Sequence, residues 1–86
     1  MICAMLFYEE NNQKCIDVMD MLEELEIRVV PTDVYNDEYL SLIDSWNVCC
    51  VPTVVFFPSY NVYTPETVSR EAFERELEYC SSLESS

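Results

Sequence analysis

The spacing of hydrophobic residues changes twice within the first 30 positions. Residues 2–7 form a continuous apolar run, typical of a strand covered on both faces. Over residues 12–26 the apolar positions recur at helical spacing, which predicts an amphipathic helix with an acidic outer face. The β-branched run 27–30 predicts a second strand, and Pro31 beside it favours a sheet edge because proline has no N–H to donate. We therefore expect residues 2–7 inside the sheet and 27–30 at its edge. The buried stripe of the helix should consist of Cys15, Val18, Met19, Leu22 and Leu25.

The second half of the chain predicts two more helices and a hairpin. Residues 36–46 have a cap at Asn36 or Asp37, residues 51–57 are apolar on both faces, and residues 61–64 can pair back as a short strand. Ser69 can cap a last helix. The buried faces of the two helices should be Tyr39, Leu40, Ile43 and Trp46, and Phe73, Leu77 and Cys80.

The resulting order is β-α-β-α-β-β-α. It predicts an α/β fold with a four-stranded mixed sheet flanked by three helices. We expect one domain over residues 1–80 and a flexible tail over 81–86.

The amino-acid composition restricts the possible functions of the chain more than it restricts its possible folds. The 86 residues carry a formal charge of −13, which repels nucleic acids and anionic membranes and attracts a basic protein partner. Glycine is absent, so Gly-rich phosphate loops are excluded and turns that need a positive φ should use Asn or Asp. Without histidine, and with five cysteines that form no C-x-x-C pair, the chain is expected to hold no metal and no cofactor. The odd cysteine count favours a reducing compartment.

No apolar run approaches the length of about 20 residues that a membrane helix needs. The start of the chain also lacks the basic region and cleavage site of a signal peptide. We expect an intracellular protein, cytoplasmic or within an assembled particle.

The stretch WNVCCVPTVVFF, residues 46–57, together with the element order, resembles the thioredoxin-like superfamily in its short form. The resemblance covers nearly the whole chain. It implies a cis peptide between Val51 and Pro52, and a groove in which Val51, Pro52 and Thr53 contact a bound partner. In that family a C-x-x-C site opens the first helix. The matching positions here are Asn12 and Cys15, so asparagine stands in place of the nucleophilic cysteine and Cys15 in place of the resolving one.

Asparagine can cap a helix but cannot attack a disulfide, so this resemblance implies that the dithiol cycle is closed. Cys15 is then either a packing residue in register with Val18 or a working single thiol. Cys49 and Cys50 lie in the loop before Val51, where Cys50 is either a reactive, partner-linking thiol or a packing residue. Cys3 and Cys80 are expected in the core.

Two functions remain open. The first is a redox-inactive thioredoxin-fold protein that binds a protein partner, as a structural module or a small subunit of a larger assembly such as a virion or organellar complex. The second is an atypical monothiol disulfide oxidoreductase that uses Cys15 or Cys50.

Overall fold

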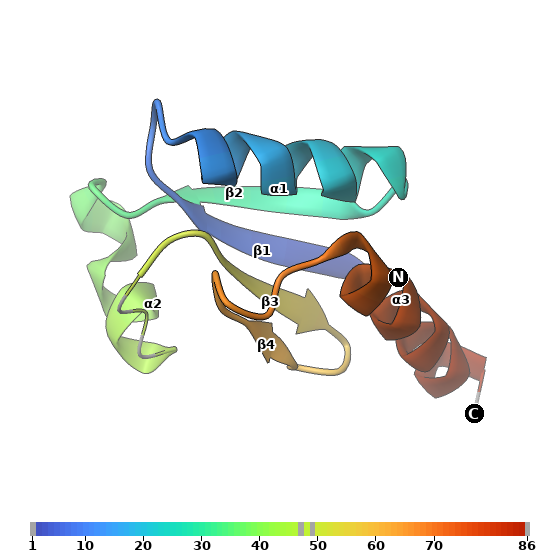
Figure 1. Ribbon diagram of the computed structural model, residues 1–86. Helices are drawn as coiled ribbons and strands as arrows, with labels where there is room; N and C mark the ends of the chain where they lie inside the picture. Colours follow the sequence, from blue (N-terminus) through green and yellow to red (C-terminus); the bar gives the residue numbers. More distant parts are fainter. Residues whose placement is uncertain (1, 47, 49, 86) are drawn as a thin grey trace.

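The computed structural model describes residues 2–46, 48 and 50–85. They form a four-stranded mixed sheet in the order β2-β1-β3-β4, with β1 (Cys3–Tyr8), β2 (Arg28–Asp33), β3 (Thr53–Phe57) and β4 (Val62–Tyr63). β1 is parallel to β2 and antiparallel to β3, and β3 is antiparallel to β4. The interior position of β1 and the edge position of β2 are confirmed (Figure 1). Strand β2 continues through Pro31, which an edge strand tolerates.

Helices α1 (Gln13–Glu24) and α3 (Arg70–Ser85) pack against the same face of the sheet. The main core lies between them and the even-numbered residues of β1, such as Leu6, because alternate strand residues point to one face. The described residues buried in this core are Ala4, Leu6, Val18, Leu22, Ile27, Val54, Phe56, Phe73 and Cys80. Each fully buried aliphatic or aromatic side chain contributes roughly 1.5–3 kcal/mol. On the outer surface Arg70 at the start of α3 forms an ion pair with Glu24 at the end of α1.

The remaining helical segment is short. A 3₁₀ turn, η1 (Asp37–Tyr39), leads into α2 (Leu40–Ser45), and Asn36 caps the turn by accepting a hydrogen bond from the Glu38 N–H (3.0 Å). The prediction that Leu40 is buried is wrong, since 55% of it is exposed. A 3₁₀ turn has three residues per turn, so it rotates the later positions away from the face that a continuous α-helix would bury. The segment lies at the end of the sheet away from the two termini (Figure 1).

Among the described residues, three adopt a positive φ: Asn11 (62°), Glu26 (58°) and Tyr60 (63°). The expectation that Asn or Asp fills such sites holds at Asn11 alone. Glu26 follows the last turn of α1, where its N–H donates to the Glu23 carbonyl and the Ile27 N–H donates to the Leu22 carbonyl (both 3.0 Å). These two bonds form a Schellman motif, which needs the left-handed conformation at that residue.

The hairpin and α3 form where the sequence predicts them, but the structure adds a second cis peptide bond and a longer α3. The peptide bonds Val51–Pro52 and Phe57–Pro58 are both cis, so the cis bond expected at Val51–Pro52 is confirmed. Ser69 caps α3, accepting a hydrogen bond from the Ala72 N–H (3.0 Å). Helix α3 continues to Ser85, into the segment that the sequence predicts to be a tail.

Candidate functional site

Asn12 caps α1 with its side chain. Its Oδ1 accepts hydrogen bonds from the backbone N–H groups of Lys14 (3.0 Å) and Cys15 (3.3 Å). The residue itself has extended geometry (φ −98°, ψ 114°), as an N-cap requires. These N–H groups at a helix N-terminus are the ones that would stabilise a thiolate, and here an amide oxygen occupies them.

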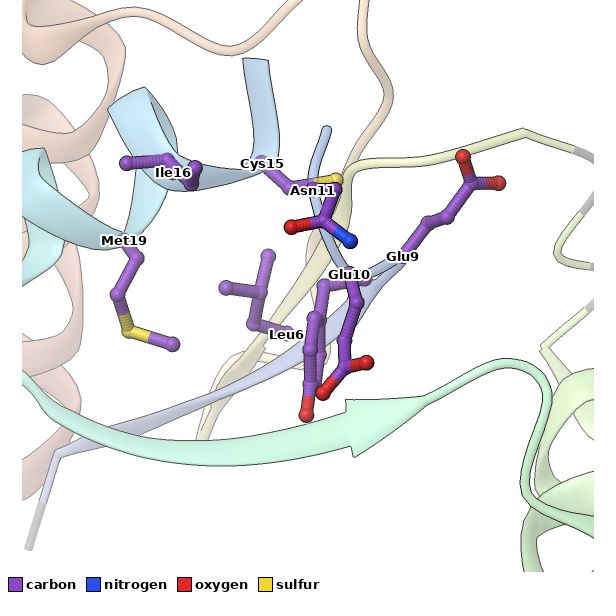
Figure 2. A pocket seen from close by; sticks show the side chains of 8 residues that line it. Leu6, Glu9, Glu10, Asn11, Cys15, Ile16 and Met19 are labelled. Atoms are coloured by element: carbon purple, nitrogen blue, oxygen red, sulfur yellow. The ribbon is translucent and has the colours of Figure 1, made fainter. Parts of the chain in front are cut away.

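Cys15 lies inside the first turn of α1 and is 3% exposed. A cavity of about 240 Å³ adjoins it. Figure 2 shows Leu6 and Met19 directed into the space between α1 and the sheet, while the Glu9 carboxylate points away from it. The eight lining residues are Leu6, Tyr8, Glu9, Glu10, Asn11, Cys15, Ile16 and Met19. With both its depth and its mainly apolar surroundings, Cys15 has the environment of a packing cysteine.

Of the residues predicted to contact a partner at the start of β3, only some are accessible to solvent. Pro52 is buried, Thr53 is 3% exposed, and Val51 is half-buried. The Thr53 hydroxyl donates to the carbonyl of Cys50 (2.7 Å), which fixes the bend into β3. Cys50 is exposed, so the surface offered at this segment consists of Cys50 and Val51.

Two hollows flank Cys50 and Val51. One, of about 330 Å³, is lined by Glu9 and by apolar side chains around α2, with Val34 and Ile43 among them. The other, of about 420 Å³, is bounded by Thr64, Pro65 and Glu66 after β4. Glu9 also lines the cavity beside Cys15, so the positions predicted from the sequence lie at one end of the sheet.

Tyr35 fixes the position of Glu9 at this end of the sheet. Its hydroxyl donates to Glu9 Oε2 (2.8 Å), and its backbone N–H donates to Asp33 Oδ1 (2.9 Å). The hydrogen bond to Glu9 and the charge of that carboxylate raise the pKa of Tyr35.

The other cysteines differ in depth. Cys3 is half-buried on β1 and Cys80 is fully buried on α3. Burial, together with a contact to a carboxylate, raises the pKa of the Cys80 thiol. Cys49, named with Cys50 in the sequence, lies outside the described residues.

A buried carboxylate that the sequence analysis missed lies at the other end of the sheet. Glu76 on α3 is 3% exposed and accepts hydrogen bonds from Ser59 Oγ (2.6 Å), Tyr63 Oη (2.7 Å) and Asn61 Nδ2 (3.0 Å), with Cys80 Sγ at 3.2 Å. Burial alone would raise the pKa of Glu76, but the hydrogen bonds from Ser59, Tyr63 and Asn61 outweigh it and lower the pKa. The burial of Tyr63 and its hydrogen bond to Glu76 raise the pKa of the Tyr63 hydroxyl. A glutamate between Phe73 and Leu77 on the buried stripe is the signal that the sequence contained.

No protein-family model matches the chain, and no curated protein matches it. Within the part of the chain that the structure describes, no helix is both long enough and apolar enough to cross a membrane. Among the same residues no group of three or more cysteine or carboxylate side chains is placed to hold a metal ion.

Proposed function

We propose that the chain is a thioredoxin-like module that binds a protein partner and does not catalyse dithiol exchange. The observation that carries the proposal is the cap of α1: Asn12 occupies the helix N-terminus and Cys15 lies buried one turn inside. In the family that the sequence resembles, these positions hold the attacking and resolving cysteines. An amide cannot form the mixed disulfide with which exchange begins.

The partner-binding part of the proposal rests on the surface around Val51. This residue lies between two mainly apolar hollows, and each hollow has a carboxylate on its lining, Glu9 in one and Glu66 in the other. An extended peptide with apolar side chains and at least one basic residue complements that surface. The formal charge of −13 would speed the approach of such a partner.

One observation favours the second candidate function. Of the four cysteines that the structure describes, Cys50 is the exposed one and lies beside the same hollows, so a monothiol oxidoreductase would use Cys50 rather than the buried Cys15. This alternative predicts that a Cys50→Ser variant loses whatever thiol-disulfide activity the wild-type protein has.

A disulfide-reductase assay with a protein disulfide as substrate tests the redox part. We expect the wild-type protein to show almost no activity and Asn12→Cys to gain a measurable rate, because the variant places a thiol at the N-terminus of α1 beside Cys15. The gain should be modest, since the acidic residues around this turn oppose a thiolate. Substantial wild-type activity, or a folded Asn12→Cys variant that forms no disulfide with Cys15, would contradict the proposal.

A displayed library of random extended peptides tests the binding part. We expect enrichment of peptides that combine apolar and basic residues, and loss of their binding in Val51→Asp. The matched control is Val62→Asp, which places the same charge on β4 away from both hollows. Enrichment that survives Val51→Asp would place the partner elsewhere.

A further inference from the structure

The cavity beside Cys15 and one of the hollows beside Val51 lie on the two sides of Glu9, which lines both. We call them the Cys15 cavity (about 240 Å³) and the α2 hollow (about 330 Å³, bordered by Leu40 and Ile43). Glu9 follows directly after β1, and Figure 2 shows its carboxylate pointing away from the Cys15 cavity. The cavity, the carboxylate and the hollow therefore form a row with Glu9 in the middle.

Both ends of this row combine an apolar interior with an exposed apolar side chain. The Cys15 cavity reaches Leu6, which is fully buried, and it is also lined by Ile16, which is 47% exposed. At the α2 hollow, Leu40 is 55% exposed. An apolar cavity of about 150 Å³ is large enough to bind benzene, so each of these spaces has room for one leucine-sized side chain.

The middle of the row is negatively charged. The Tyr35 hydroxyl donates to Glu9 Oε2 (2.8 Å), and a carboxylate accepts up to about four hydrogen bonds, so Glu9 can also bind a basic side chain. Glu10, an exposed residue, adds a second carboxylate at the Cys15 cavity. The basic residues of the sequence are all described, and none of them lines either space: Lys14, Arg28, Arg70 and Arg75. A ligand that complements the row therefore carries a cation between two apolar groups.

We propose that this row binds an extended segment of a protein partner with the pattern apolar-x-basic-x-apolar. The inference rests on the proposed function, from which the extended conformation is taken, and it adds the Cys15 cavity to that site. Alternate residues of an extended chain point to the same side, so residues i, i+2 and i+4 reach three neighbouring contacts. One apolar side chain enters the Cys15 cavity, the basic one pairs with Glu9, and the other apolar one enters the α2 hollow, which Val51 also lines.

Two features of the pattern follow from the chemistry of the row. Arginine suits its central position, because a guanidinium binds a carboxylate through two parallel N–H groups. The pattern also reads the same in both directions, so it does not depend on which way the partner chain runs.

Short capped peptides test the pattern on the wild-type protein. We expect acetyl-Ser-Leu-Ser-Arg-Ser-Leu-Ser-amide to bind about tenfold or more tightly than the same peptide with uncharged norleucine in place of arginine, because that change removes the charged pair with Glu9. A control peptide of identical composition, with its two leucines adjacent, should bind as weakly. Calorimetry gives the affinities, and the methyl signals of Ile16, Met19 and Leu40 in NMR spectra should shift during the titration. Equal binding of the control peptide would overturn the pattern.

Protein variants locate the contacts. Glu9→Gln still accepts the bond from Tyr35 but is neutral, so it should abolish the preference for arginine over norleucine. Its control is Glu71→Gln, at an exposed acid of α3. Ile16→Asp should weaken binding about tenfold or more by placing a charge at the Cys15 cavity, whereas Val62→Asp, at a residue 43% exposed on β4, should not. If Ile16→Asp does not fold, Leu40→Asp makes the same test at the α2 hollow.

The outcomes separate this inference from the proposed function. Library peptides whose binding depends on Val51 but not on Glu9 or Ile16 would leave the proposed function standing and exclude the row. If no peptide binds in either experiment, both proposals fall. If hexylammonium ion shifts the Met19 methyl signal while the peptides do not, the Cys15 cavity is a site for a small organic cation, and the assignment to a protein partner is wrong.

Discussion

The hydroxyl of Tyr63 on β4 donates a 2.7 Å hydrogen bond to the carboxylate of Glu76 on α3. Ser59 and Asn61, from the turn between β3 and β4, donate to the same carboxylate. One side chain of α3 thus binds three donors from five consecutive residues. A carboxylate 3% exposed is stable in such a place only because these donors replace its water.

Removing the charge of Glu76 should destabilise the protein. Glu76→Gln keeps the shape of the side chain but turns one acceptor into a donor that faces Ser59, Asn61 or Tyr63, so we expect a loss of about 1–3 kcal/mol in the free energy of unfolding. Urea denaturation measures it. The control, Glu78→Gln, changes an exposed glutamate of the same helix and should alter stability by no more than about 0.5 kcal/mol. Equal stability of the two variants would mean that the buried network contributes nothing.

The same network predicts how stability depends on pH. The pKa of Glu76 is lowered in the folded state, so the stability it contributes is complete above its unfolded pKa of about 4.3 and is lost as pH falls through the folded value. Acid unfolding should therefore be less steep in Glu76→Gln than in the wild-type protein. Identical slopes would contradict the lowered pKa.

At high pH, stability falls as pH rises, which is the opposite of its dependence in acid. The pKa of Tyr63 is raised in the folded state, so its contribution is complete below the unfolded pKa of about 10 and is lost as pH rises through the folded value. Tyr63→Phe should therefore lose less stability than the wild-type protein between about pH 9 and about pH 11. Urea denaturation at each pH measures this loss. Tyr79→Phe, at an exposed tyrosine of α3, is the control that should leave this limb unchanged.

Truncating the cap of α1 should cost about 1 kcal/mol. Asn12→Ala leaves the N–H groups of Lys14 and Cys15 without their side-chain acceptor, whereas Asn12→Ser can accept the same bonds. Thermal and urea unfolding of the pair measure the difference. If alanine and serine are equally stable, the cap has no energetic role.

Glycine at the end of α1 should stabilise the chain. Glu26 is left-handed, a conformation that costs a residue with a Cβ roughly 1–2 kcal/mol, and Glu26→Gly removes that cost while adding some unfolded-state freedom. We expect a net gain of up to about 1 kcal/mol. Glu23→Gly, in the last turn of the helix itself, should instead lose about 1 kcal/mol. A loss in both variants would show that the Glu26 side chain contributes more than its backbone costs.

Local sequence patterns predicted the elements well, because their causes are local. Pro31 indicated the edge strand, Asn12 the start of α1, and the spacing of Phe73 and Cys80 the buried side of α3. Each of these follows from one residue's backbone chemistry or from helical periodicity.

The missed features depend on contacts between segments. The carboxylate of Glu76 is buried because donors 13 to 17 residues earlier in the chain reach it, and helical periodicity carries no information about those donors. The exposure of Leu40 follows from a 3₁₀ turn where an α-helical turn was expected. Tyr60 adopts a positive φ, and its ring contacts with Trp46 and Phe57 form only in the folded chain.

The second strand of the hairpin has only two residues in its ladder, Val62 and Tyr63. A strand so short would open readily if backbone pairing alone held it. Because Ser59, Asn61 and Tyr63 are bound to α3 through Glu76, β4 can detach only when those side chains leave the carboxylate. In native-state hydrogen exchange, the amides of β4 should therefore open in one cooperative unit with the middle of α3. The amides of β2, the strand at the opposite edge of the sheet, should exchange independently of that unit.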